Sequence, residues 1–210
     1  LQFSGLNTQI QIQEEWADYI DRNYEIIQGW VELNLIQYLQ KRNPSVPGIV
    51  DKLYPPKERN LEKVKKYWKM LVSIKPIGEI YGEKPLNEKN ISIDHFVPWS
   101  YVAHDELWNL TPTIRSINSS KSNSLPDWNM YFPLLCKMEY LSYELMWEYP
   151  EVHKAFDKCA KEHLNNPEIR HKLYQRGLTE TEFSGRLEEV MFPIYQSAKS
   201  MGFSSWSLRT

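Results

Sequence analysis

Five polar side chains with chemically useful groups lie within one short stretch of this sequence, residues 91–126. The stretch reads ISIDHFVPWSYVAHDELWNLTPTIRSINSSKSNSLP, and the five residues are Asp94, His95, Asn109, Asn118 and Lys121. They interrupt apolar runs at places where a fold should bury hydrophobic side chains. Such a local conflict between pattern and composition indicates a functional site.

The residue types point to hydrolysis at phosphorus. Histidine is the side chain whose unperturbed pKa suits a general base near neutral pH. Asp94 and Asn118 offer hard oxygen ligands, which Mg²⁺ prefers while it draws its other ligands from water and substrate phosphate. A base that activates water, beside a metal ion that stabilises the leaving oxygen, describes a phosphodiester hydrolase. Asn109 is expected to hydrogen-bond the imidazole of His95 and fix its orientation, and a turn asparagine is the alternative.

A strand and a helix must bring these side chains together. Residues 91–97 are rich in apolar residues that favour a strand, and Pro98 ends it. Because neighbours along a strand point to opposite faces, Asp94 and His95 are expected to diverge unless the strand bulges or ends there. A helix is predicted from about Thr113 to Asn123, which places Asn118 and Lys121 on one face.

The strand needs a partner, and the preceding segment is the predicted one. Residues 77–81 are strand-like and residues 85–90 are rich in turn formers, so the sequence predicts a β-hairpin of 77–81 with 91–97. Gly82 is expected to permit an unusual backbone angle. Residues 105–112 are predicted to be a loop, because Pro112 bars a central strand. The hairpin and the helix after Thr113 would complete a ββα unit.

The order and spacing of the five residues resemble the HNH endonuclease motif. The matching parts are Asp94-His95 within IDHFVPWS, Asn109 within WNLTP and Asn118 within RSINSSKSNSLP, which is the variant with asparagine at the third named position. The sequence is most similar to the HNH domain of RNA-guided CRISPR nucleases and of bacterial restriction or defence HNH proteins without a zinc ribbon. The motif covers roughly a sixth of the chain.

The resemblance implies a ββα-metal fold, one divalent metal ion and hydrolysis that leaves a 5′-phosphate. By the match, Asp94 and Asn118 take the metal-ligand positions, with Mg²⁺ as the expected ion and Mn²⁺ as a substitute. His95 takes the general-base position, and Asn109 takes the position that orients it. Lys121 matches a basic residue of the finger helix that approaches phosphate, and a solvated lysine is the alternative.

Residues 41–75 form a basic block in an otherwise mildly acidic chain, with ten Lys or Arg residues against three acids. Lys63, Lys66 and Lys69, on a helix predicted over 57–75, are its candidate nucleic-acid contacts. A solvated helix face is the alternative. Arg115 and His104, close to the motif, are further candidates for phosphate contact and not for catalysis.

Composition limits the class of protein. With 210 residues and 41% hydrophobic residues, the chain suits one domain or a compact pair with a buried core. The net charge of −2 excludes a protein that holds long duplexes by charge alone, so a phosphate-binding surface must be local or supplied by a partner.

Cys136 and Cys159 form no CxxC pair, which excludes a four-cysteine structural zinc and fits a reduced cytoplasm. The sequence shows neither a membrane span nor a signal peptide, so no membrane partner is expected. Because the chain begins at Leu1 and not at Met, we expect a fragment or a processed form.

The expected fold class is α+β and mainly helical, with the HNH finger embedded between helical segments. The predicted parts are an N-terminal helical region with the basic helix (1–76), the ββα-metal core (77–126) and a C-terminal helical cap (127–210). Helices are predicted over 12–39 with a kink or a close helix contact at Gly29, then over 57–75, 127–148, 150–164, 168–175 and 180–201. The tail beyond Gly202 either docks or frays. His153, His163 and His171 on the cap helices have no partners at ligand spacing, so a metal role there is the weaker alternative.

The predicted function is metal-dependent endonucleolytic cleavage of DNA in a bacterial or phage restriction or defence system, with RNA as the alternative substrate. Two other classes remain open. One is a DNA-binding module that does not cleave, and the other is a nuclease effector gated by a partner or a fused sensor domain. Double-strand cleavage would need a homo-oligomer or sequential nicking.

Overall fold

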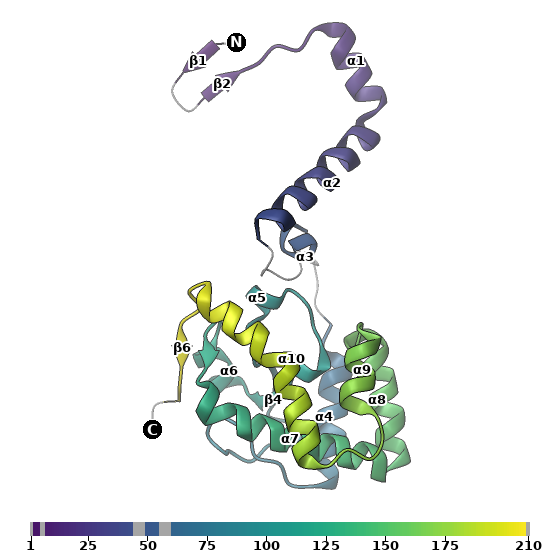
Figure 1. The fold of residues 1–210 in the computed structure, drawn as a ribbon, viewed down its shortest axis with the longest axis vertical. Helices are drawn as coiled ribbons and strands as arrows, with labels where there is room; N and C mark the ends of the chain where they lie inside the picture. Colours follow the sequence, from purple (N-terminus) through teal and green to yellow (C-terminus); the bar gives the residue numbers. More distant parts are fainter. Residues whose placement is uncertain (1, 5–6, 44–48, 55–59, 209–210) are drawn as a thin grey trace. The chain divides into compact units, whose positions relative to one another are not determined.

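The computed structural model describes residues 2–4, 7–43, 49–54 and 60–208. The chain forms two compact units, Leu1–Pro44 and Ser45–Thr210. The fold is mainly helical with small two-stranded sheets, which confirms the predicted fold class (Figure 1). No described helix is long and apolar enough to cross a lipid bilayer.

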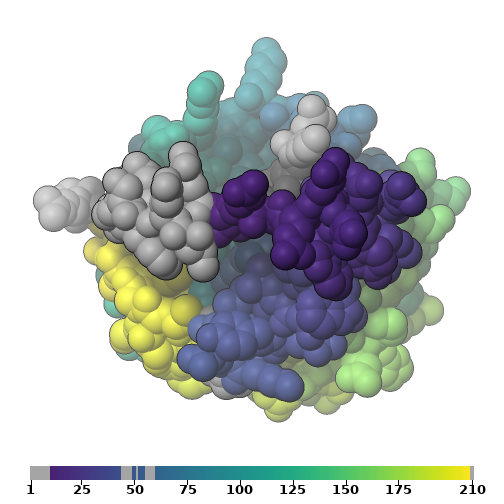
Figure 2. All heavy atoms as spheres, turned by 90° about the horizontal axis from the view of Figure 1, so that it is seen from above, coloured from purple at the N-terminus to yellow at the C-terminus, as the bar shows by residue number. Residues whose placement is uncertain are grey.

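The first unit contains a short hairpin and two helices. Strand β1 (Gln2–Ser4) pairs antiparallel with β2 (Asn7–Gln9), and α1 (Glu14–Arg22) and α2 (Tyr24–Arg42) follow. The single helix predicted over 12–39 is wrong, because the break falls at Asn23, whose amide donates to the carbonyl of Tyr19 at 2.8 Å, while Gly29 stays inside α2. Neither helix buries a described residue, and Figure 2 draws their side chains in purple and blue-violet.

The second unit holds the remaining helices. They are α3 (Ile49–Leu53), α4 (Glu62–Ile74), α5 (Trp99–Val102), the 3₁₀ turn η1 (Leu107–Asn109), α6 (Arg115–Lys121), α7 (Trp128–Glu148), α8 (Pro150–His163), α9 (Pro167–Tyr174) and α10 (Glu180–Ser200). The last four agree with prediction to within a residue or so. Thr179 and Glu182 form a reciprocal capping box that begins α10. The predicted start of the basic helix, 57–59, and the prolines of the predicted connector 43–56 lie outside the described residues.

The sheet of the predicted finger pairs different strands from those expected. Strand β3 (Ile91–His95) runs antiparallel to β4 (Leu110–Ile114), with Asp94 opposite Thr111 and His95 opposite Leu110. The predicted hairpin of 77–81 with 91–97 is therefore wrong, and so is the loop predicted over 105–112. A two-stranded sheet has only edge strands, and an edge strand tolerates Pro112.

Residues 79–84 form a tight turn in place of the predicted first strand. The buried carboxylate of Glu79 accepts hydrogen bonds from the backbone N–H groups of Tyr81 at 2.8 Å and Gly82 at 2.7 Å. The unusual backbone angle expected at Gly82 is absent. The glycine instead allows the side chain of Leu208 to come close, because a Cβ at this position would lie 2.7 Å from it. This turn sets Tyr81 beside the end of β3.

Two other segments support the finger. Helix α4 packs on β3 and β4, and the fully buried Trp68 donates from its indole nitrogen to the carbonyl of Leu110 at 3.2 Å. The C-terminal tail docks, because β6 (Ser205–Trp206) pairs in parallel with β5 (Leu125–Pro126) and Trp206 packs edge-on against Tyr81. Helix α6 then follows β4 directly, so β3, β4 and α6 form a ββα unit. The predicted boundaries 1–76, 77–126 and 127–210 remain a prediction, although α4 belongs to the same compact unit as this finger.

Candidate active site

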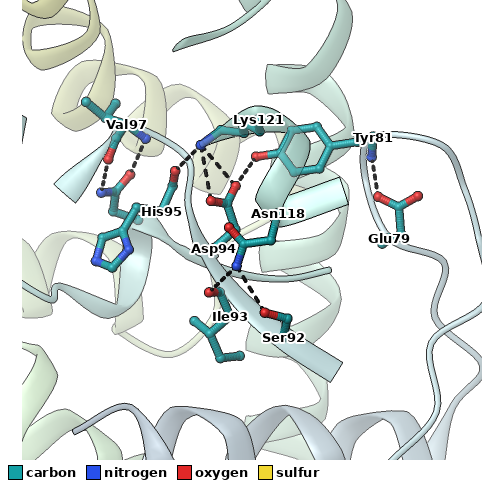
Figure 3. Close-up of polar contacts among 10 residues, drawn as sticks. Glu79, Tyr81, Ser92, Ile93, Asp94, His95, Val97, Asn118 and Lys121 are labelled. Atoms are coloured by element: carbon teal, nitrogen blue, oxygen red, sulfur yellow. Dashed lines mark hydrogen bonds and ion pairs between the residues drawn. The ribbon is translucent and has the colours of Figure 1, made fainter. Parts of the chain in front are cut away.

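The carboxylate of Asp94 is buried near the end of β3 and held from two sides (Figure 3). The hydroxyl of Tyr81 donates to Oδ2 at 2.7 Å, and Nζ of Lys121 lies 3.1 Å from both carboxylate oxygens. Burial, and then the charge of Asp94, raise the pKa of Tyr81 well above its ordinary value. The phenol therefore stays protonated and acts as a donor, which fixes the direction of the carboxylate.

Lys121 is completely buried at the end of α6. Besides Asp94, its ammonium group donates to the backbone carbonyl of His95 at 2.7 Å. The predicted contact of Lys121 with nucleic acid is therefore wrong for this structure. The residue holds the end of β3 against α6 from inside, because an ammonium group without solvent needs an anion and an acceptor around it.

Asn118 projects from the middle of α6 toward β3. Its amide nitrogen donates to the carbonyl of Ile93 at 2.9 Å and to the hydroxyl of Ser92 at 3.0 Å. Two acceptors on the nitrogen fix the amide orientation, so the oxygen of Asn118 takes the opposite direction. Figure 3 shows this oxygen on the side of the Asp94 carboxylate.

The ring of His95 is buried and contacts a residue that the sequence did not single out. Its Nε2 atom lies 2.7 Å from Oδ1 of Asp105, in the loop between α5 and η1. Figure 3 shows the ring and the Asp94 carboxylate on different sides of the strand, as expected for neighbours along it. The only signal for Asp105 was its place inside the motif, in HDELWN.

Asn109 is fully buried and forms two hydrogen bonds with one residue. Its side-chain oxygen accepts from the backbone N–H of Val97 at 2.8 Å, and its nitrogen donates to the carbonyl of Val97 at 2.9 Å. These bonds hold the backbone two residues beyond His95. The imidazole contact predicted for Asn109 is instead made by Asp105.

Asp94, His95 and Asn118 share a pocket. The pocket measures about 250 Å³, and Leu61, Pro98, Trp99 and Asn123 are among its other lining residues. The structure thus brings together the predicted base and both predicted metal ligands from β3 and α6.

A larger groove of about 920 Å³ lies beside this pocket, and both are lined by Leu61 and Ile93. Its cations are Lys65, Lys89 and Arg115, with Glu62 as its acid. Of these, the sequence singled out only Arg115, which is exposed at the start of α6. Lys65 belonged to the basic block on the predicted helix 57–75, and Lys89 carried no signal.

The three lysines selected from the basic helix lie elsewhere on α4. Lys63 forms an ion pair with Glu162 of α8. Lys66 is exposed and Lys69 is half-buried, and the described lining of the groove includes none of the three. Their contact with nucleic acid therefore remains a prediction that the groove does not support. His104 lies against the ring of Trp108.

Residues 78–127 match the family model described as HNH endonuclease. This segment is an HNH endonuclease domain. No curated protein and no solved structure matches the chain. The HNH domain indicates a nuclease of the HNH type, which implies nucleic-acid binding, and such nucleases generally use a divalent metal ion.

The donor set of the HNH pocket fits a hard divalent ion. Asp94 and Asn118 supply a carboxylate and an amide oxygen, which suit Mg²⁺ when water and phosphate complete its shell. A carboxylate has about four lone-pair directions, so Tyr81 and Lys121 leave room for a further partner on Asp94. Within the described part of the chain, no group of three His, Cys, Asp or Glu residues could hold a metal ion, and this includes His153, His163 and His171.

Proposed function

We propose that the HNH domain hydrolyses phosphodiester bonds in DNA, with His95 as the general base. The observation that carries this proposal is the shared pocket, which is lined by Asp94 and His95 of β3 and by Asn118 of α6. An imidazole can take a proton from water near neutral pH. The position of the HNH match on the same residues supports the choice of reaction.

Each pocket residue has a distinct part in this proposal. His95 takes the proton from the attacking water, and the Asn109–Val97 hydrogen bonds keep the backbone beyond His95 in place. Asp94 and Asn118 hold the ion, Mg²⁺ or in its place Mn²⁺, with Asp94 directed by Tyr81 and Lys121. When bound, such an ion supplies positive charge for the phosphate and the leaving 3′-oxygen.

We place the substrate strand in the groove next to the pocket. Lys65, Lys89 and Arg115 give the groove a positive balance against Glu62, and Arg115 suits phosphate because its guanidinium can donate two parallel hydrogen bonds. The shared residues Leu61 and Ile93 let one strand extend from the groove to the base. A local cationic groove also fits a chain whose net charge is only −2.

The first experiment is cleavage of supercoiled plasmid in Mg²⁺ and in Mn²⁺, with EDTA as the metal-free control. The parent protein is expected to nick or linearise the plasmid, and His95→Ala is expected to abolish cleavage while its circular dichroism spectrum stays unchanged. His171→Ala is the matched control, because His171 is exposed on α9. Robust cleavage by His95→Ala would contradict the assignment of the base.

Cleavage of three labelled substrates with one sequence (single-stranded DNA, duplex DNA and RNA) identifies the nucleic acid that the protein cuts. We expect cleavage of DNA and products that carry a 5′-phosphate. Binding of DNA without cleavage in any divalent metal would favour a non-cleaving module, and activity that appears only with an added partner would favour a gated effector. The restriction or defence setting rests on the resemblance alone.

A further inference from the structure

We propose that Asp105 is the residue that positions the ring of His95, and that the C-terminal helices hold Asp105 in place. This inference rests on the proposed role of His95 as the base. It goes beyond that role because it assigns the orientation of the imidazole to a loop carboxylate and to the C-terminal helices that hold the loop, which are called the cap below. Asp105 would act through His95 and would not touch the substrate.

The first step is the contact itself. Nε2 of His95 and Oδ1 of Asp105 are 2.7 Å apart, and the two side chains are only 7% and 18% exposed. An ionised carboxylate can only accept, so the proton of this hydrogen bond belongs to Nε2. In the neutral ring the lone pair then lies on Nδ1, which is the atom that takes up a proton. The contact therefore sets both the tautomer and the angle of the imidazole.

The second step is how the loop that carries Asp105 is fixed. Nδ1 of His163, at the end of α8, lies 2.9 Å from the backbone oxygen of Asp105. The next residue, Glu106, is buried, and its Oε1 accepts from the backbone and side-chain N–H groups of Asn165 at 3.2 and 3.1 Å. His163 at the end of α8 and Asn165 just beyond it therefore hold the loop at two successive residues, Asp105 and Glu106.

The backbone before Asp105 also indicates that the loop is held in a fixed conformation. Ala103 has a φ of 57°, in the left-handed region that a residue with a Cβ rarely adopts. Such a conformation persists where surrounding contacts determine it, and it turns the chain from α5 into the loop. Asn109 holds the backbone beyond His95, and Asp105 holds the ring, so the base is fixed at two points.

A tautomer measurement tests the contact without catalysis. Long-range ¹H–¹⁵N spectra of the metal-free protein, recorded where the ring is neutral, are expected to show His95 protonated at Nε2. Asp105→Ala should give a mixture of the two tautomers. A parent ring protonated at Nδ1, or an unchanged ring in Asp105→Ala, would overturn the proposal. This result stands apart from the proposed function, because it needs no cleavage.

Kinetics test the consequence. Asp105→Ala is expected to lower kcat about 10- to 100-fold, the range known for losing the partner that orients a metal-bound histidine, with little change in KM. Asp105→Glu should keep more activity than Asp105→Ala. Asp157→Ala, an exposed pair with Arg170 on the cap, is the matched control.

The role of the cap has its own variant. Asn165→Ala removes one of the two donors to Glu106 and leaves the backbone donor, so the fold should survive. We expect kcat to fall several-fold and the Nε2 tautomer to become less dominant. Asn166→Ala, which removes only the N-terminal cap of α9, is the control. Loss of thermal stability without change in tautomer or kcat would show that the cap is structural only.

Discussion

The Nζ atom of Lys121 lies 3.1 Å from Oδ1 of Asp94, and both side chains are buried inside the second unit. This pair joins the last residue of α6 to the strand that carries the proposed base, His95. It also places a positive charge beside the buried carboxylate of the proposed metal ligand. The lysine of the motif is therefore a structural partner of the proposed metal ligand.

Replacing Lys121 should damage the fold more than the binding of nucleic acid. Lys121→Met leaves the carboxylate of Asp94 buried without its cation, so the free energy of unfolding should fall by about 3–5 kcal/mol. Urea denaturation followed by circular dichroism measures this change. Lys66→Met, an exposed lysine on α4, should stay within about 0.5 kcal/mol of the parent. Parental stability with weakened DNA binding would instead restore Lys121 as a phosphate contact.

Removing the amide of Asn118 should weaken the metal site. Asn118→Ala is expected to reduce Mn²⁺ binding, measured by electron paramagnetic resonance, and to lower cleavage in the same preparation. Asn123→Ala is the matched control, because Asn123 lines the same pocket and makes none of the contacts described for Asn118. Equal Mn²⁺ affinity in all three proteins would remove Asn118 from the ligand set.

The groove should carry the salt dependence of DNA binding. Each lost phosphate contact lowers the slope of log affinity against log salt by about 0.9 for duplex DNA, so Lys65→Gln with Arg115→Gln should lower it by nearly two. Fluorescence anisotropy over a salt series gives the slope. Lys63→Gln should leave the slope unchanged, because Lys63 is paired with Glu162. The opposite pattern would move the binding surface to the outer face of α4.

Glu139 should make stability depend on pH. It is buried on α7, and burial raises the pKa of its carboxyl group well above 4.5. The folded protein keeps a proton that the unfolded chain releases above about pH 4.5, so stability should fall as pH rises from there toward the folded-state pKa.

Glu139→Gln removes this proton linkage. The variant should gain stability over the parent at pH 8 and gain much less at pH 5, as measured by urea denaturation at both values. Glu144→Gln, an exposed change on the same helix, should show no such difference. An equal effect of Glu139→Gln at both pH values would contradict the raised pKa.

Local signals were enough for much of the fold and for the centre of the site. Helices α7 to α10 began and ended near their predicted residues, because apolar periodicity, Pro150, Pro167 and the Thr179 cap act within a few residues. The motif spacing also placed Asp94, His95 and Asn118 together correctly, since one strand and one following helix position all three.

The errors concern contacts between distant parts of the chain. The partner of β3 was misassigned, because Pro112 argued against a strand and the choice between two neighbours depends on how α4 packs over the sheet. The burial of Lys121 depends on Asp94, which is 27 positions away, and a lone lysine on a helix carries no sign of such a partner.

Residue types and spacing alone therefore predicted an HNH-type nuclease and placed Asp94, His95 and Asn118 in one pocket, because adjacent elements hold these side chains. The contact between His95 and Asp105 could be found only in the folded chain. Asp105 contacts His95 from a loop that is itself bonded to His163, at the end of α8, and to Asn165, two residues beyond it. Contacts of this kind follow from packing between helices and loops, and no local pattern encodes them.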